Sequence, residues 1–222
     1  AIQTKMRDDL IEAEKLKQQL SLSLLQQQVN PHFLYNTLDN ICALAELDEK
    51  ETLIQLVMNL SSFYRSSLSN GKMHISIGQE LEISRAYLEI LQIRYFHKFD
   101  FTITCPEALK NYSCIKLLLQ PILENSIYHG IKGLDRHGIL HIEAEDTGDC
   151  IRFTISDNGR GFSKEDYEKI WQEDADHFGI KSIQQRILLY YGPGYGLSMQ
   201  SPQTGGCITM ITLPKQEGLP CH

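Results

Sequence analysis

Apolar positions recur along this chain with a helical period in its first third and with a mixed period after it. Residues 1–29 contain no Gly or Pro, and apolar residues recur there at alternating four- and three-residue steps, interrupted by Lys17. Such a stripe predicts a signalling helix in a parallel coiled coil, although a single amphipathic surface helix gives the same pattern. The stripe consists of Met6, Leu10, Ala13, Leu20 and Leu24.

Two further helices are predicted next, one from His32 to about Glu46 and one from about Glu51 to Leu68, each with an apolar stripe at helical spacing. Joined by a short polar turn, they would form an antiparallel hairpin. One hairpin buries little apolar surface, so two copies are expected to form a four-helix bundle in a homodimer. The expected parts of the chain are a signalling helix at 1–29, the hairpin at 30–72 and a larger domain at 73–222.

Pro31 stands just before the first helix of the hairpin and allows two interpretations. Proline lacks an N–H and clashes with the preceding turn, so Pro31 would kink a helix that continues from residue 29. It is also well tolerated in the first turn of a new helix, with Asn30 as the cap. The sequence leaves both interpretations open.

After the polar linker "SNGK" at 69–72, strands and helices follow one another. Strands are predicted at 99–105, 139–146, 150–157, 195–201 and 207–214, and helices at 80–95, 115–131 and 179–191. Helices interleaved with mostly hairpin-connected strands predict an α/β sandwich in which helices cover one face of the sheet. The fold class expected for the whole chain is therefore α+β, a helical hairpin followed by this sandwich.

Composition narrows the partners and the chemistry. The formal net charge is -7, which disfavours binding to nucleic acid and to anionic membrane surfaces. No apolar run is long enough to span a bilayer, so a membrane anchor is expected only in a segment upstream of this chain. The six cysteines form no C-x-x-C pair and are expected to be reduced thiols, and the histidines show no metal-ligand spacing. Metal chemistry would therefore use oxygen ligands and a nucleotide.

Three segments carry the candidate chemistry, although the chain has no P-loop. In "LQPILENSIYHG" (119–130), Glu124 and Asn125 stand within an apolar helix. Buried faces rarely hold such residues, and an Asn carbonyl is a suitable Mg²⁺ ligand. The alternative is a partly exposed polar edge of a core helix.

The other two segments are rich in glycine. "DNGRGF" (157–162) follows a strand and offers the Asp157 carboxylate to an amine donor, while its glycines let the backbone approach a flat base. In "HFGIKSIQQRI" (177–187), Gly179 opens a helix whose free N–H groups can face phosphates, with Lys181 and Arg186 nearby. The acidic stretch between them is predicted to be a flexible lid.

In this order the three segments resemble the N, G1 and G2 boxes of the GHKL (Bergerat) ATP-binding superfamily. Upstream, "QQQVNPHFLYNTLDNI" is similar to the phosphoacceptor segment of the LytS/YesM-like sensor histidine kinases, N-P-H-F-L-[FY]-N, and residues 80–95 resemble the helix that follows the dimerisation hairpin in that family. The resemblance implies a two-component kinase core that uses ATP and Mg²⁺, phosphorylates its own histidine and passes the phosphoryl group to an aspartate of a response regulator receiver domain. It also implies the cytoplasmic portion of a membrane sensor.

The resemblance assigns roles to individual residues. His32 is the phosphoacceptor, and Asn36, one helical turn later, is a candidate for phosphatase activity. Asn125 matches the Mg²⁺ ligand, Asp157 matches the residue that recognises adenine, and Glu124 is a candidate catalytic base that could instead orient Asn125. The remaining residues of the expected nucleotide pocket are His129, Gly159, Gly161, Gly179 and Lys181.

The chain also departs from the family pattern. His177 stands where the G2 box usually begins with glycine, Tyr128 replaces a common Lys or Arg that would reach phosphate, and Cys207 replaces a usual Thr. These changes motivate one alternative, a degenerate module that binds nucleotide and relays conformation without kinase turnover. Another alternative is a GHKL protein that phosphorylates serine on a partner, but such proteins lack the P-H-F-L hairpin.

Overall fold

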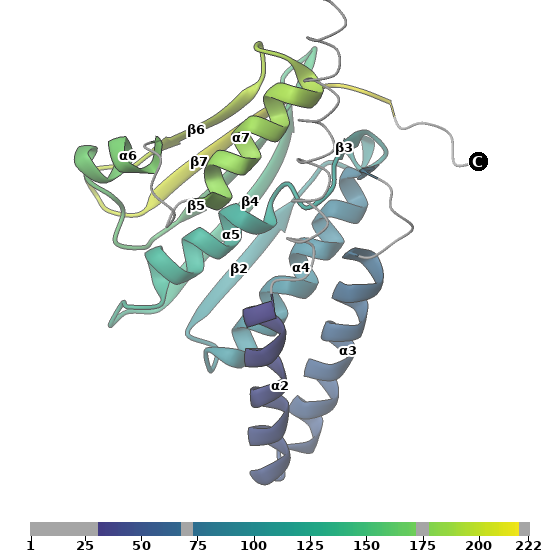
Figure 1. Cartoon of the computed structure of the whole chain (residues 1–222), viewed down its shortest axis with the longest axis vertical. Helices are drawn as coiled ribbons and strands as arrows, with labels where there is room; N and C mark the ends of the chain where they lie inside the picture. Colours follow the sequence, from purple (N-terminus) through teal and green to yellow (C-terminus); the bar gives the residue numbers. More distant parts are fainter. Residues whose placement is uncertain (1–30, 68–72, 172–177, 218–222) are drawn as a thin grey trace, which may run out of the picture. The chain divides into compact units, whose positions relative to one another are not determined.

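A mixed five-stranded sheet, with strand order β2-β4-β5-β7-β6, is the centre of the larger part of the molecule (Figure 1). The computed structural model of the protein describes residues 31–67, 73–171 and 178–217. The chain divides into two compact units, Ala1–Lys50 and Glu51–His222, and the sheet belongs to the second.

The helices and strands that the sequence predicts occur in the predicted order, and β1, η2, β3 and α6 are additional elements. The helices are α2 (Pro31–Glu46), α3 (Lys50–Ser67), α4 (Ile77–Arg94), α5 (Gln120–Asn125), α6 (Lys164–Trp171) and α7 (Phe178–Tyr191), with the 3₁₀-helix η2 (Glu107–Leu109) and the π-helix η3 (Ser126–Ile131). The strands are β1 (His74–Ser76), β2 (Phe99–Thr104), β3 (Ser113–Ile115), β4 (Gly138–Asp146), β5 (Cys150–Asp157), β6 (Gly196–Gln200) and β7 (Cys207–Pro214).

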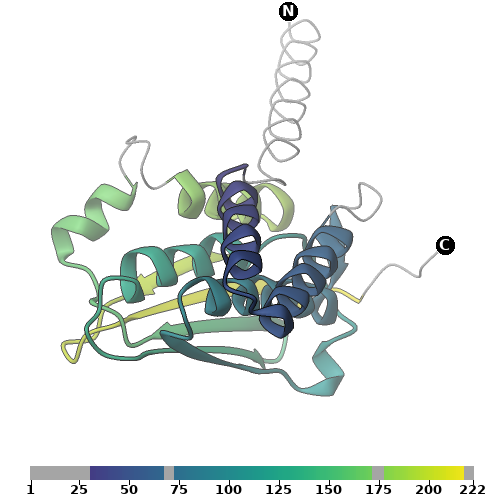
Figure 2. The same cartoon turned by 90° about the horizontal axis from the view of Figure 1, so that it is seen from below.

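Burial alternates along the strands because helices cover one face of the sheet. In β5, Ile151, Phe153 and Ile155 are buried, and Asp157 is the next position in the same series. Figures 1 and 2 show α4, α5 and α7 lying across one face of the sheet. The predicted one-sided sandwich is confirmed. It follows that Asp157 points into the layer between sheet and helices.

Two features of the sheets differ from the expectation of mostly hairpin-connected strands. Strand β2 pairs with β4 in parallel, and α5 and η3 lie in the connection between them. A small second sheet pairs β1 with β3 in antiparallel fashion. Each of these two strands has three residues, which is too short for a period-two pattern to be recognised.

The predicted helix at 115–131 was wrong in its first part. Ile115 ends β3, and α5 begins only at Gln120. Leu117 has a positive φ of 55°, which an α-helix does not accept. Pro121 then fits because it stands in the first turn of α5, where a missing N–H costs nothing.

The two helices predicted for the hairpin are confirmed as α2 and α3, while several other predictions lie outside the described residues. These are the signalling helix at 1–29, the residues before Pro31 that would separate a kink from a helix start, the linker at 69–72, and His177. None of the described helices combines the length and the apolarity needed to span a membrane. The five cysteines within the described residues form no disulfide.

A capping box starts α4 and offers a test of the fold. Ser76 Oγ accepts from Gln79 N at 3.1 Å, and Gln79 Oε1 accepts from Ser76 N at 3.1 Å. We expect Ser76→Ala to destabilise the protein by about 1 kcal/mol and to lower Tm by roughly 2–4 °C. Thermal unfolding followed by circular dichroism measures this, with Ser61→Ala on the exposed side of α3 as the control. Equal Tm values for the two variants would contradict the capping role.

Candidate functional site

Asp157 is the last residue of β5, and its side chain is buried, with 8% of the residue exposed. Its Oδ1 accepts hydrogen bonds from Gly159 N at 2.9 Å and from Cys207 N at 3.2 Å. Its Oδ2 is buried and has no hydrogen-bond partner among the described residues. Burial raises the pKa of Asp157, while the nearby Ser126 hydroxyl and the two backbone hydrogen bonds oppose that shift. Because an unpaired buried carboxylate oxygen is unfavourable, Oδ2 is suited to accept a donor from a ligand.

Glycines allow the backbone to pack closely around Asp157. A Cβ at Gly159 would lie 2.7 Å from Gly130 Cα, and a Cβ at Gly130 would lie 3.2 Å from Asp157 Oδ1. Arg160 N donates to Gly130 O at 3.1 Å, which joins the turn after β5 to the end of η3. Gly161 has a φ of 71°, a conformation that glycine adopts readily and other residues do not. A side chain at Gly159 would therefore force this turn away from η3.

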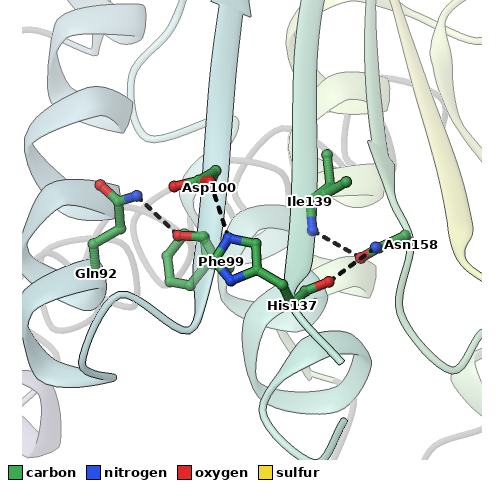
Figure 3. Close-up of polar contacts among 6 residues, drawn as sticks. All are labelled: Gln92, Phe99, Asp100, His137, Ile139 and Asn158. Atoms are coloured by element: carbon green, nitrogen blue, oxygen red, sulfur yellow. Dashed lines mark hydrogen bonds and ion pairs between the residues drawn. The ribbon is translucent and has the colours of Figure 1, made fainter. Parts of the chain in front are cut away.

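Asn158 holds the same turn against strand β4 (Figure 3). Its Oδ1 accepts from Ile139 N at 2.7 Å, and its Nδ2 donates to His137 O at 3.1 Å. His137 Nε2 lies 2.9 Å from Asp100 Oδ2, which extends the contacts to β2 (Figure 3). Because both the oxygen and the nitrogen of the Asn158 amide are hydrogen-bonded to the backbone, the turn cannot rotate easily, and the preceding residue Asp157 keeps its direction. Sequence reasoning missed Asn158, although its place inside the D-x-G-x-G motif was an available signal.

Glu80 of α4 fixes the point at which α5 begins. The side chain is fully buried, with Oε2 accepting from Leu117 N and Oε1 from Leu119 N, both at 2.8 Å. Burial raises the pKa of Glu80, while these backbone bonds and the charge of Arg186 oppose that shift. Arg186 of α7 donates to Leu117 O at 3.2 Å and also to Lys116 O. The turn before α5 is therefore held from both sides by opposite charges.

Glu80 was not among the predicted site residues. It falls at helical spacing with Ile77, Ile83 and Tyr87, all of which are buried. A charged residue within such an apolar face needs buried partners, and this was the signal that sequence reasoning could have used. The sequence predicts Arg186 as a positive charge near the phosphates, but in the structure its guanidinium donates to the backbone carbonyl of Leu117.

The start of α5 matters because this helix carries the second motif. Asn125 is its last residue and is half-buried. Burial raises the pKa of the neighbouring Glu124, and the charge of Arg94 opposes that shift. Burial raises the pKa of Tyr87 on α4, and the charge of Glu124 adds to that shift, so Glu124 lies near α4. His129 is exposed in the π-helix η3, a wider helical turn that occurs often at functional sites.

The N-terminus of α7 lies close to α5. A Cβ at Gly179 would lie 3.4 Å from Pro121 Cβ, which is an ordinary van der Waals contact, so the first turns of the two helices pack against each other here. Lys181 is half-exposed on the second turn of α7. The first part of the predicted lid forms helix α6, and residues 172–177 lie outside the described residues.

Cys207 is accommodated without disturbing Asp157. Its contribution is the backbone N–H at 3.2 Å from Asp157 Oδ1, which any residue except proline could supply. Burial raises the pKa of the Cys207 thiol to about 11, so the thiol is neutral, and it lies 3.6 Å from Thr209 Oγ1. The departure from Thr at this position therefore leaves the polar contacts of Asp157 intact.

His32 and Asn36 form a second group of predicted site residues, on α2 in the first unit. His32 is exposed, and Asn36 Nδ2 lies 3.0 Å from its Nδ1 and 3.1 Å from its Nε2. A neutral imidazole has one ring nitrogen with a free lone pair, so only that nitrogen can accept from the amide. The Asn36 amide thus stands beside the ring atoms that would take part in chemistry.

Two family matches cover most of the chain. Residues 20–99 match the family described as histidine kinase. Residues 112–217 match the family described as histidine kinase-, DNA gyrase B-, and HSP90-like ATPase. The first match ends at Phe99, the first residue of β2, and the second begins at Tyr112, immediately before β3.

Curated relatives and a solved structure agree with these matches. The chain is 31% identical over 209 residues to sensor histidine kinase YesM of Bacillus subtilis, covering 94% of this chain and 36% of YesM. It is 26% identical to sensor protein LytS of Staphylococcus epidermidis, covering 94% of this chain and 35% of LytS. The chain thus spans about a third of the length of these relatives. The histidine kinase ThkA, solved in complex with response regulator TrrA, has a similar fold at 15% identity, with a TM-score of 0.51 over 92% of this chain and 66% of ThkA.

Proposed function

Because this chain belongs to the LytS/YesM-like sensor histidine kinases, with an ATPase domain of the GHKL type, we propose that it binds ATP with Mg²⁺ and phosphorylates its own His32. The lone pair of one imidazole nitrogen attacks the terminal phosphorus, a P–N bond forms, and the bond from phosphorus to the bridging oxygen breaks. ADP leaves with that oxygen. The neutral form of the imidazole already carries a free lone pair on one ring nitrogen, so it can attack without first losing a proton.

The observation that carries this proposal is the unpaired buried Oδ2 of Asp157. Adenine presents an amine donor on its edge, which this oxygen can accept, whereas guanine presents a carbonyl oxygen at the same place. The close packing of Gly130 against Gly159 leaves no side chain between the turn and the base. These features support recognition of adenine by Asp157, with Gly159 and Gly161 shaping the pocket.

The residues near Asp157 fit a nucleotide-bound Mg²⁺ better than a protein-built metal site. No three His, Cys, Asp or Glu side chains gather as a metal cluster in the part of the chain that the structure describes. Asn125 would be the protein ligand, through its amide oxygen. Bound Mg²⁺ supplies neutralisation of the phosphate charge. Gly179 and Lys181 would face the phosphates from α7, and His129 would complete this side of the pocket.

The remaining roles rest on the same premise. The Asn36 amide lies within 3.1 Å of the His32 ring, which supports a role in orienting a water for phosphatase activity, and Glu124 is a candidate base beside Asn125. We propose transfer of the phosphoryl group from His32 to an aspartate of a receiver domain, supported by the ThkA structure, which holds a response regulator. Attachment to a membrane through an upstream segment stays a prediction, as do the part boundaries at 29 and 72.

The test of nucleotide recognition is calorimetric titration of the whole chain with ATP, GTP and ATP in the presence of EDTA. We expect ATP with Mg²⁺ to bind, GTP to bind at least tenfold more weakly, and EDTA to weaken ATP binding. Equal affinity for ATP and GTP would contradict the role of Asp157. A chain that binds ATP but never transfers phosphate would instead be the degenerate module, an alternative that the contacts of Cys207 do not favour.

A homodimer is the expected assembly, and α3 supports it. Ile54, Val57 and Met58 are spaced for one side of α3 and are 53%, 44% and 63% exposed. We expect Met58→Lys to weaken the dimer about tenfold, because it removes apolar surface that a second copy would bury. Sedimentation velocity across a micromolar concentration series measures this, with Lys50→Met at the exposed start of α3 as a control. A wild-type chain that is monomeric throughout the series would defeat the prediction.

A further inference from the structure

A cluster of two cations and two tyrosines lies beside α5, at the junction of α4 and η3. Arg94, the last residue of α4, donates from Nη1 to Tyr128 Oη at 2.9 Å. Its Cζ also lies 5.3 Å from the ring centre of Tyr95 and 5.8 Å from that of Tyr128. The two rings meet edge to face at 6.1 Å. The guanidinium is therefore held in one place by a hydrogen bond and two ring contacts.

Lys132 brings a second positive charge to the same two rings. Its Nζ lies 5.5 Å from the ring centre of Tyr128 and 5.9 Å from that of Tyr95. Like charges repel, so two cations gathered on one pair of rings favour an anion placed between or beside them.

The cluster stands next to the proposed metal ligand. Tyr128 follows Asn125 by three residues, which is about one helical turn. Helix α4 ends at Arg94, and the chain turns immediately after it, because Phe96 and His97 both have a positive φ of 52°, which an α-helix does not accept. At position 128 the family pattern has Lys or Arg, and this chain has Tyr128. Arg94, which comes from a separate helix, places its positive charge next to Tyr128.

We propose that Arg94, held by Tyr128 and supported by Lys132, contacts the terminal phosphate of ATP. The proposal rests on the proposed function and identifies the group that distinguishes ATP from ADP at that site. The terminal phosphate of ATP, which ADP lacks, adds negative charge that one bound Mg²⁺ does not fully neutralise. A charge-assisted contact from a planar guanidinium to a phosphate is stronger and more directional than a neutral hydrogen bond. The Tyr128 departure is then compensated by a cation from α4.

The experiment compares the affinities of the whole chain for ATP and for ADP, both with Mg²⁺, by calorimetry. We expect Arg94→Ala to weaken ATP binding about tenfold while ADP affinity stays within about twofold. Adding Tyr128→Lys to Arg94→Ala should restore the ratio of ATP to ADP affinity. Tyr128→Phe, which keeps the ring and removes the hydroxyl that holds Arg94, should reduce ATP affinity by a smaller factor and serves if Arg94→Ala does not fold.

The matched control is Arg85→Ala. Arg85 is also on α4, and its Cζ also lies over an aromatic ring, 5.9 Å from the ring centre of Phe101. Phe101 belongs to β2 and not to the tyrosine cluster. Its removal should leave both affinities unchanged. Equal losses of ATP and ADP affinity in Arg94→Ala, or no loss at all, would overturn the proposal while leaving the nucleotide site in place. A wild-type chain that binds neither nucleotide would overturn the proposed function itself.

Discussion

Replacing His32 with glutamine should abolish autophosphorylation while ATP affinity changes by no more than a few-fold. Glutamine has no ring nitrogen with a nucleophilic lone pair, so the P–N bond cannot form. The side chain is exposed on α2 and glutamine is a good helix former, so folding should be unaffected. Transfer of label from γ-labelled ATP measures the first part, and calorimetry measures the second.

The matched control for His32→Gln is His141→Gln. His141 is exposed on β4 and its Nδ1 lies 2.6 Å from Thr102 Oγ1, so it belongs to neither group of predicted site residues. It should keep full labelling. If the His32 variant is labelled as well as the wild type, the acceptor is another residue and the assignment of His32 is wrong.

Replacing Asp157 with asparagine should weaken ATP binding about a hundredfold, the upper range for loss of a hydrogen bond to a charged group. Asparagine keeps one oxygen that can accept from Gly159 N and Cys207 N, so the backbone contacts of the turn are preserved. It places an NH₂ donor where the unpaired Oδ2 stands. That donor opposes the adenine amine and suits the carbonyl oxygen of guanine, so preference for ATP over GTP should also fall.

Asn158 offers no substitute for Asp157 in this test, because its amide is already engaged with β4. Calorimetry with ATP and GTP, together with a melting curve to establish folding, gives the result. A folded Asp157→Asn chain whose ATP affinity matches the wild type would show that adenine is bound elsewhere. In that case the pocket assignment built on the DNGRGF segment would be wrong.

The repeating parts of the fold were predictable because they depend on periodicity. Strands β5 and β7 occur at 150–157 and 207–214 as predicted, since alternate residues are buried against one layer of helices. Asp157 was recognisable for the same reason, because it interrupts an inward-facing apolar series at a strand end. Motif spacing then linked it to the glycines that follow.

Features that depend on tertiary contacts were not predictable. Leu117 adopts a positive φ in a segment with strong helical pattern because Glu80 and Arg186 hold the surrounding backbone groups. The sequence around Leu117 does not indicate these two partners, because both are tens of residues away in the chain. The compensation of Tyr128 by Arg94 is of the same kind, since it requires the end of α4 to meet η3.

The central claim is that this chain transfers the terminal phosphoryl group of ATP to His32. Its most direct test is the chemical stability of the label that the wild-type chain acquires from γ-labelled ATP with Mg²⁺. Phosphohistidine is lost in acid and kept in base, so the label should show this behaviour and should map to the peptide that contains His32. Absence of label, or a label that survives acid as phosphoserine does, would contradict the account.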